Sequence, residues 1–294
     1  MTEFFQQVVS GLALGAIYAA LALALVLIHR ATGVINFAQG EMAMFSTYIA
    51  WTLWQNHGWD KWLAAGATLV IAFVGGVLIQ RTVIRPIERA SILTVVIVTI
   101  GLLLIFNGAA AWIWTAEVRF FPSLFPNETV SVGGVAISMI DLGTIASVLV
   151  LVSLLWAFFQ FTKIGLAMRA SALNPDASRL VGVRVGWMLG IGWGLAAMLG
   201  AVAGILTAPT TTLDPTMMQA ILIYAFAAAV LGGIDSPFGA VAGGLMLGVG
   251  LNLIGAYLDF VGSDLRLPVA LLVILVVLLV KPEGLFGKPV ARRV

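Results

Sequence analysis

The sequence predicts an all-α membrane protein that crosses the bilayer several times. Hydrophobic residues make up 61% of the 294 residues and charged residues only 10%, whereas a soluble domain carries about 25% charged residues. The apolar runs are long enough for helices, because a helix needs about 20 residues to cross the hydrocarbon core. Strands of a membrane barrel are about ten residues long and alternate in hydrophobicity, so helices are the predicted spans.

Nine apolar runs follow one another along the chain. They lie at 8–28, 42–54, 62–80, 92–114, 137–159, 187–208, 217–231, 237–256 and 267–280. The second and seventh, with 13 and 15 residues, are short enough to be broken or tilted helices that borrow from a polar flank. We therefore expect eight or nine transmembrane or re-entrant helices, with a broken helix near 33–55.

The basic residues predict the orientation. One side of the membrane would hold the segments 29–41, 81–91, 160–186, 232–236 and 281–294. Twelve basic residues then lie on that side: Arg30, Arg81, Arg85, Arg89, Lys163, Arg169, Arg179, Arg184, Lys281, Lys288, Arg292 and Arg293. Only Lys61, Arg119 and Arg266 lie on the other. Cytoplasmic loops carry an excess of Lys and Arg, so the C-terminus is predicted to be cytoplasmic and the N-terminus periplasmic. That orientation needs an odd number of crossings, which nine satisfies.

No segment resembles a soluble domain, so residues 1–294 are expected to form one transmembrane domain. The first apolar run has no Lys or Arg before it and no convincing cleavage site after it, which favours a retained helix. The longest polar stretches are an external loop, 115–136, and a cytoplasmic loop, 160–186. The external loop has two prolines and a Gly pair, which suit an ordered loop or a short hairpin.

Small residues recur at every fourth position in three places. The rows are Gly186, Gly190 and Gly194; Gly192, Ala196, Gly200 and Gly204; and Gly244 and Gly248. Such rows let helix backbones approach closely inside a membrane. They indicate close packing within one bundle, or a surface that rearranges during transport, and the sequence does not separate the two.

The motifs of catalysis and of cofactor binding are missing from the sequence. Cysteine is absent and there are two histidines, His29 and His57, so a metal site is not expected. A phosphate-binding loop needs G-x-x-x-x-G-K-[ST], and the nearest candidate, Gly287-Lys288, is followed by Pro289. We expect no enzyme activity, no cofactor and no nucleic-acid partner.

The stretch GVINFAQGEM at 33–42 places three polar side chains, Asn36, Gln39 and Glu41, in an otherwise apolar region. In one interpretation, Asn36 caps a new helix, Gln39 completes a capping box and Glu41 lies in the favourable dipole field of the first turn. In the other, the helix starts inside the membrane and the three side chains line a transport path. The two interpretations are compatible.

Other polar residues interrupt apolar runs, namely Thr99, Asn107, Tyr224 and Asn252. Each is either an interhelical hydrogen-bonding group or a residue of the translocation path. The junction GGIDSPFGA at 232–240 is a second break next to a short apolar run.

The inner loop contains the signals of a short amphipathic helix. Asn174 is a suitable N-cap, Pro175 suits the first helical position, and Asp176 favours the helix start. Gly182 ends the helix, which leaves Leu180 on its apolar side and Arg179 among its polar residues. An ordered helix in such a loop indicates a docking element for a soluble partner; the alternative is a solvated basic loop.

Three motifs together resemble the permeases of branched-chain amino-acid ABC importers, and most closely the LivH-type inner-membrane subunit. They are GVINFAQGEM, the loop GLAMRASALNPDASRLVGV at 165–183, and GGIDSPFGA. The likeness extends over nearly the whole chain. It implies a second related permease as heterodimer partner, two cytoplasmic ATPase subunits and a periplasmic substrate-binding protein. It also implies that 170–182 is a coupling helix and that Asn36, Gln39 and Glu41 lie near the path.

The resulting hypothesis is a permease subunit that imports amino acids by alternating access. A stand-alone channel or facilitator for urea or an amide, and a scaffold without a path of its own, are the rival hypotheses.

Overall fold

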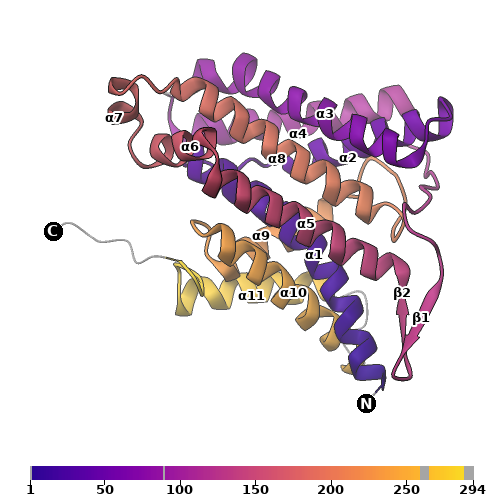
Figure 1. Ribbon diagram of the computed structural model, residues 1–294. Coiled ribbons are helices and arrows are strands. Elements are labelled where there is room, and N and C mark those ends of the chain that lie inside the picture. The colour runs from indigo at the N-terminus through magenta and orange to yellow at the C-terminus, as the bar shows by residue number, and fades with distance from the viewer. Residues whose placement is uncertain (1, 89, 259–264, 288–294) are drawn as a thin grey trace. The chain divides into compact units, whose positions relative to one another are not determined.

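The computed structural model describes residues 2–88, 90–258 and 265–287 (Figure 1). Its α-helices are α1 (Thr2–Thr32), α2 (Gln39–Trp51), α3 (Lys61–Ile79), α4 (Ile92–Trp114), α5 (Met139–Phe161), α6 (Lys163–Leu173), α7 (Pro175–Leu180), α8 (Val185–Thr207), α9 (Gln219–Gly232), α10 (Pro237–Tyr257) and α11 (Arg266–Val280). Two π-helical turns, Thr52–Asn56 and Gln80–Ile84, follow α2 and α3, and a 3-10 turn covers Arg85–Ile87. The all-α prediction is confirmed, and α6 is a helix that the sequence did not predict.

Six of the described helices are long and apolar enough to cross a membrane. They are α1, the stretch Lys61–Ile87 that begins with α3, α4, α5, α8 and α10. The helices α9 and α11 are also apolar, with 14 and 15 residues. These lengths are those of a multi-pass membrane protein.

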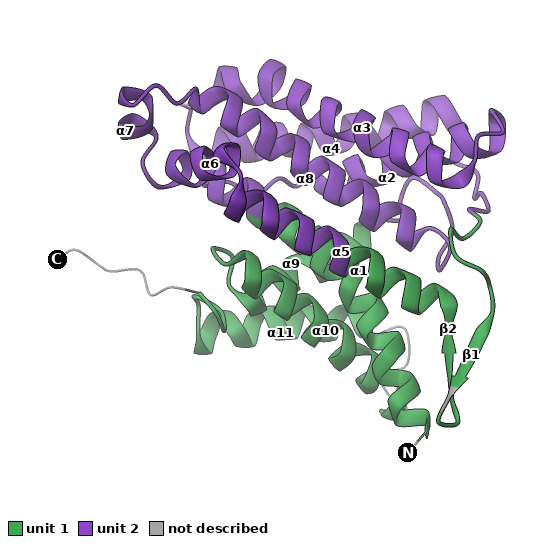
Figure 2. Ribbon diagram, in the orientation of Figure 1, with its two compact units in different colours: residues 1–26, 122–148, 219–294 green, residues 27–121, 149–218 purple. Residues whose placement is uncertain are grey.

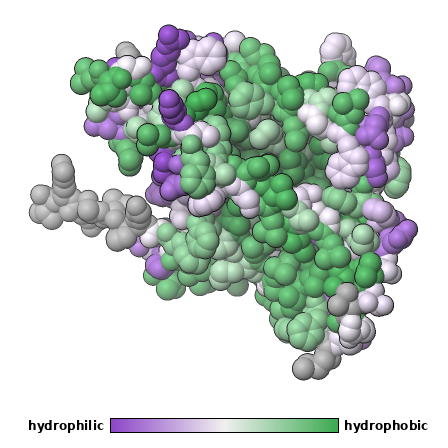
Figure 3. Space-filling view, in the orientation of Figure 1, coloured by the Kyte–Doolittle hydropathy of each residue, from purple (hydrophilic) through white to green (hydrophobic). Residues whose placement is uncertain are grey.

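The surface of the helices is also that of a membrane protein. Large apolar side chains are exposed on α3, α4, α5 and α11, for example Leu78, Leu104, Leu154 and Leu279. Figure 3 shows that much of the visible surface is hydrophobic. Water would penalise such a surface, whereas lipid tails accept it.

The chain divides into two compact units (Figure 2). Unit 1 contains residues 1–26, 122–148 and 219–294, and unit 2 contains 27–121 and 149–218. The helices α1 and α5 contribute residues to both units.

Unit 2 is organised around α8, which packs against α2 and α3. The predicted rows of small residues lie at these two contacts. A methyl group at Gly194 would lie 2.8 Å from the Phe73 ring of α3, and one at Gly204 would contact Thr47 of α2. Close packing is therefore confirmed at Gly194 and Gly204, whereas a methyl group at Gly186 would lie 4.0 Å from Arg85 Nε.

Unit 1 packs α10 on α1 and on α9. A methyl group at Gly244 would lie 2.5 Å from the Ala19 Cα, and one at Gly248 would contact the backbone of Gly15. Beyond α9, the segment 285–286 hydrogen-bonds to the carbonyls of Leu231 and Gly232, at 2.9 and 3.0 Å. These bonds tie the end of α11 to the GGIDSPFGA junction.

The loop 115–136 contains an antiparallel hairpin of β1 (Thr129–Val132) and β2 (Val135–Ser138). Its two turn residues, Gly133 and Gly134, have φ values of +61° and +84°, which glycine adopts at no steric cost. The prediction of an ordered loop or short hairpin is confirmed here. Four of the basic residues assigned to the inner side, Arg89, Lys288, Arg292 and Arg293, lie outside the described residues.

Candidate transport path and coupling loop

The first part of the site is the buried polar start of α2, in unit 2. The side chains of Asn36 and Gln39 are fully buried and Glu41 is 2% exposed. The Asn36 Nδ2 donates to Gln39 Oε1 at 3.2 Å, and the Ala38 N–H donates to Asn36 Oδ1 at 3.1 Å. Three buried polar side chains thus lie within six residues at the start of α2, and two of them, Asn36 and Gln39, bond to each other.

The predicted capping box is wrong in its details. The N-cap of α2 is Ala38, without a side-chain cap, and Asn36 lies two residues earlier. Gln39 does not reach back to the Asn36 backbone. Its Oε1, the atom that a capping box would use, accepts instead from the Asn36 side chain, and its Nε2 donates to the Ala196 carbonyl of α8 at 2.8 Å.

The glycines of α8 make this bond possible. A methyl group at Gly200 would lie 2.7 Å from Gln39 Nε2 and 3.4 Å from the Ala43 Cβ. Glycine therefore lets a polar side chain lie between two closely packed helices. Glu41, in the first turn of α2, lies where the helix dipole favours a negative charge.

The other predicted path residues lie apart from this cluster. Asn107 is in unit 2, and its Nδ2 donates to the Pro215 carbonyl at 2.8 Å. Asn252 and Tyr224 belong to unit 1. The Asn252 Nδ2 donates to the Gln7 carbonyl at 2.7 Å, and the Tyr224 ring lies 5.0 Å from that of Tyr18. Asn107 and Asn252 therefore each make a hydrogen bond to a distant segment of the chain. This structural role was the alternative to a place in the translocation path.

An aromatic cluster at the other end of α2 was missed by the sequence analysis. The Tyr48 ring stacks on Trp114 of α4 at 5.0 Å, and Phe45 meets the same ring edge-on at 5.1 Å. The Arg119 Nη2 donates to the Trp114 carbonyl at 2.7 Å. The sequence contained one signal that could have pointed to Tyr48. It follows Glu41 by seven residues, which places both side chains on one face of the helix.

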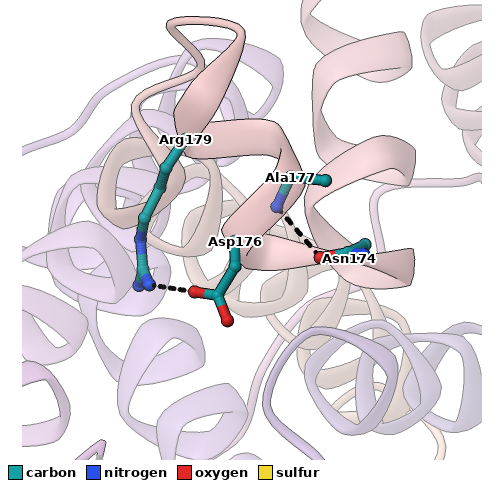
Figure 4. A network of polar contacts seen from close by, with 4 residues as sticks. All are labelled: Asn174, Asp176, Ala177 and Arg179. Carbon is teal, nitrogen blue, oxygen red and sulfur yellow. Dashed lines mark hydrogen bonds and ion pairs between the residues drawn. The ribbon is translucent and has the colours of Figure 1, made fainter.

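The second part of the site is the loop 160–186, which is ordered as α6 and α7. The Thr162 hydroxyl caps α6 by accepting from the Gly165 N–H at 2.9 Å. Asn174 Oδ1 caps α7 by accepting from the Ala177 N–H at 3.0 Å (Figure 4). Pro175 occupies the first turn, and Gly182 follows with a φ of +85°. The predicted helix start and stop are both confirmed.

The exposed face of this loop is apolar at its tip. Leu180 is 89% exposed, Leu173 83% and Val181 79%. Beside them, Arg179 and Asp176 form an ion pair at 2.8 Å (Figure 4). The loop thus presents apolar side chains next to a polar rim.

A multi-pass helical protein with polar side chains buried at a break between helices has the construction found in many membrane transporters. The chain belongs to the family of branched-chain amino acid transport system permease components, whose model matches residues 7–280. It is 32% identical to the high-affinity branched-chain amino acid transport system permease protein BraD of Pseudomonas aeruginosa, over 99% of this chain and 98% of that protein. It is 30% identical to LivH of Escherichia coli, named as the same kind of permease protein, over the same shares.

These relatives do not favour a stand-alone channel. The solved structure of PsaBC from Streptococcus pneumoniae in complex with Fab is similar over 93% of this chain and 91% of its own, at 14% identity and a TM-score of 0.49. The fold described above rests on the helices of this chain alone.

Proposed function

We propose that this chain is the membrane-spanning subunit of an ATP-driven ABC importer of branched-chain or related amino acids. The full-length relatives named as permease proteins for these amino acids support the substrate class. A second related permease would complete the path, two cytoplasmic ATPase subunits would hydrolyse ATP, and a periplasmic binding protein would deliver the substrate. The path would open alternately to the two sides of the membrane.

The proposed membrane arrangement has eight or nine crossings in one permease domain, 1–294, within the inner membrane. The six long helices would cross fully, and the shorter α2, α9 and α11 would cross or re-enter. The N-terminus would be periplasmic and the C-terminus cytoplasmic, as the distribution of basic residues indicates. A reporter that fluoresces only in the cytoplasm should be bright when fused after Val294 and dark within 120–130. The reverse pattern would overturn this orientation.

In this proposal the translocation path includes Asn36, Gln39 and Glu41, with Asn107, Tyr224 and Asn252 as further candidates. The side chains of Asn36 and Gln39 are fully buried in an apolar protein. This burial supports a role beyond capping, because polar groups at membrane depth are costly to keep.

The observation that carries the proposal is the order of the inner loop. The helix α7 has six residues, which is too short for a stable isolated helix. Its apolar tip is exposed, so a partner protein would bury it. The cytoplasmic ATPase is the proposed partner, with Leu180 as the anchor in its groove and Asn174, Pro175 and Gly182 holding the helix.

The proposal is tested by Leu180→Asp in the assembled complex. Buried anchors commonly contribute about 2 kcal/mol or more to an interface, while rim charges contribute little. Leu180→Asp should therefore weaken co-purification of the ATPase and abolish substrate-stimulated ATP hydrolysis. Arg179→Ala, which removes the exposed ion pair with Asp176, is the matched control and should do much less. Full attachment and normal stimulated hydrolysis with Leu180→Asp would mean that the loop is only a solvated connection.

A further inference from the structure

The aromatic cluster of unit 2 contains two buried polar atoms without a partner. Among the residues that the structure describes, neither the Tyr48 hydroxyl nor the Arg119 Nε has a hydrogen-bond partner. The Tyr48 side chain is 0% exposed. Nearly all buried polar groups in proteins are paired, so each unpaired one needs an explanation.

The two atoms are held in place by their neighbours. The Trp114 ring stacks on Tyr48, and the Trp114 carbonyl accepts from Arg119 Nη2 at 2.7 Å. The Arg119 guanidinium lies 4.6 Å from the centre of the Trp51 ring. The Arg119 backbone is also paired with Leu213, with N–O distances of 2.9 and 3.0 Å. Both side chains are therefore fixed, and their free donors are fixed with them.

The chemistry of this cluster fits an amino acid carboxylate. A tyrosine O–H and an arginine N–H are both donors, and an ionised carboxylate is an acceptor only. The rings of Phe45, Trp51 and Trp114 offer an apolar contact for an aliphatic side chain. Bonds of this kind are strongest where aromatic rings exclude water.

The position of the cluster agrees with an entry role. Tyr48 lies on the same face of α2 as Glu41, seven residues and about 10 Å further along the helix. In the proposed orientation, Glu41 is nearer the cytoplasm and the 115–121 segment is outside. An amino acid entering from outside would therefore meet donors for its carboxylate first and a carboxylate for its ammonium group second.

We propose that Tyr48 and Arg119 form an outer recognition site that binds the carboxylate of an entering amino acid, one step before Glu41. This inference rests on the proposed function and adds to it two residues and the group that they recognise.

The test uses the reconstituted complex with its binding protein carrying radiolabelled L-leucine. Tyr48→Phe keeps the stacked ring and removes only the hydroxyl. Leucine uptake per ATP hydrolysed should fall about tenfold, the usual loss for a hydrogen bond to a charged group. Stimulated ATP hydrolysis should persist, because the coupling loop is unchanged. Tyr257→Phe, at an exposed position of unit 1, is the control and should leave the ratio unchanged.

Three outcomes overturn the inference. An unchanged uptake ratio in Tyr48→Phe would show that the hydroxyl contacts no substrate. Uptake and hydrolysis falling together in an assembled complex would show a merely structural role. A wild-type complex that takes up neither leucine nor any other amino acid tested would overturn the proposed function itself. This outcome is distinguished from the other two because the unmodified protein also fails. Should Tyr48→Phe fail to assemble, Arg119→Lys, which keeps the charge and removes the Nε–H, is judged by the same ratio.

Discussion

Two helix–helix contacts, α1 on α10 in unit 1 and α2 on α8 in unit 2, both use glycines but differ in what the glycines face. In unit 1, a methyl group at Gly248 would contact backbone atoms of Gly15 and lie 2.6 Å from the Gly11 carbonyl oxygen. In unit 2, one at Gly200 would meet the amide end of the Gln39 side chain at 2.7 Å. At these two positions the first contact joins backbone to backbone and the second places a polar side chain against a backbone, although a methyl group at Gly204, further along α8, would also lie 2.8 Å from the Ala43 carbonyl oxygen of α2.

The difference has a mechanical consequence. A backbone cannot move aside without moving its helix, whereas a side chain can adopt another rotamer. Gln39 holds two bonds at once, since its Nε2 donates to the Ala196 carbonyl and its Oε1 accepts from Asn36 Nδ2, and a different rotamer would release both. We therefore expect the α1–α10 contact to determine whether the protein folds, and the α2–α8 contact to determine whether it transports. The predictions below are ordered by their effect on the amount of folded permease.

The largest effect is expected for Gly248→Ala. Its new methyl group would overlap the α1 backbone, so the two helices must separate, and overpacking of this kind costs about 1–3 kcal/mol. The permease should be extracted in lower amount and should unfold at a lower temperature, as measured by size-exclusion chromatography and thermal unfolding.

The matched control is Gly250→Ala, in the same helix two residues further on. A methyl group at Gly250 would meet nothing within 4 Å, so only the helix propensity changes, by up to about 1 kcal/mol in favour of alanine. Equal behaviour of the two variants would break the comparison, because close backbone contact would then not limit folding.

The elements of unit 1 and unit 2 could be predicted because their signals are local. Each apolar run coincides with a helix, and the start of α7 at Asn174 and Pro175 follows from capping rules that depend on neighbouring residues. The start of α2 shows the limit. The capping rule failed at Asn36: the N-cap is Ala38, Gln39 Oε1 accepts from the Asn36 side chain, and Gln39 Nε2 donates to α8, which is distant in the sequence.

A smaller effect on folding is expected for Gly200→Ala. The methyl group would displace the Gln39 amide, which can move, and the bond to the Ala196 carbonyl would be lost. Such a bond contributes about 0.5–1.5 kcal/mol. The complex should assemble in nearly normal amount, while amino-acid uptake per complex should fall. A Gly200→Ala permease that is as poorly folded as Gly248→Ala would show that the two contacts are mechanically alike.

The candidate site was only partly predictable for the same reason. Asn36, Gln39 and Glu41 stand out because polar residues are rare in an apolar chain. Tyr48 and Arg119 do not, because an aromatic residue in an apolar run and a basic residue in a loop are ordinary. Only folding joins them, through Trp114.

The smallest effect on folding, with a large effect on transport, is expected for Glu41→Gln. Glutamine keeps the shape of the side chain and removes a buried charge that is costly at membrane depth, so the amount of folded permease should not fall. If the Glu41 carboxylate binds the ammonium group of the substrate, uptake should fall about tenfold, because a charge-assisted bond is lost. The measurement is leucine uptake by the reconstituted complex, normalised to the permease present. Glu128→Gln, at an exposed position directly before β1, is the matched control. Normal uptake with both Glu41→Gln and Glu41→Ala would show that Glu41 only stabilises the start of α2. The polar contact of unit 2 would then serve packing alone, as the glycine contact of unit 1 does.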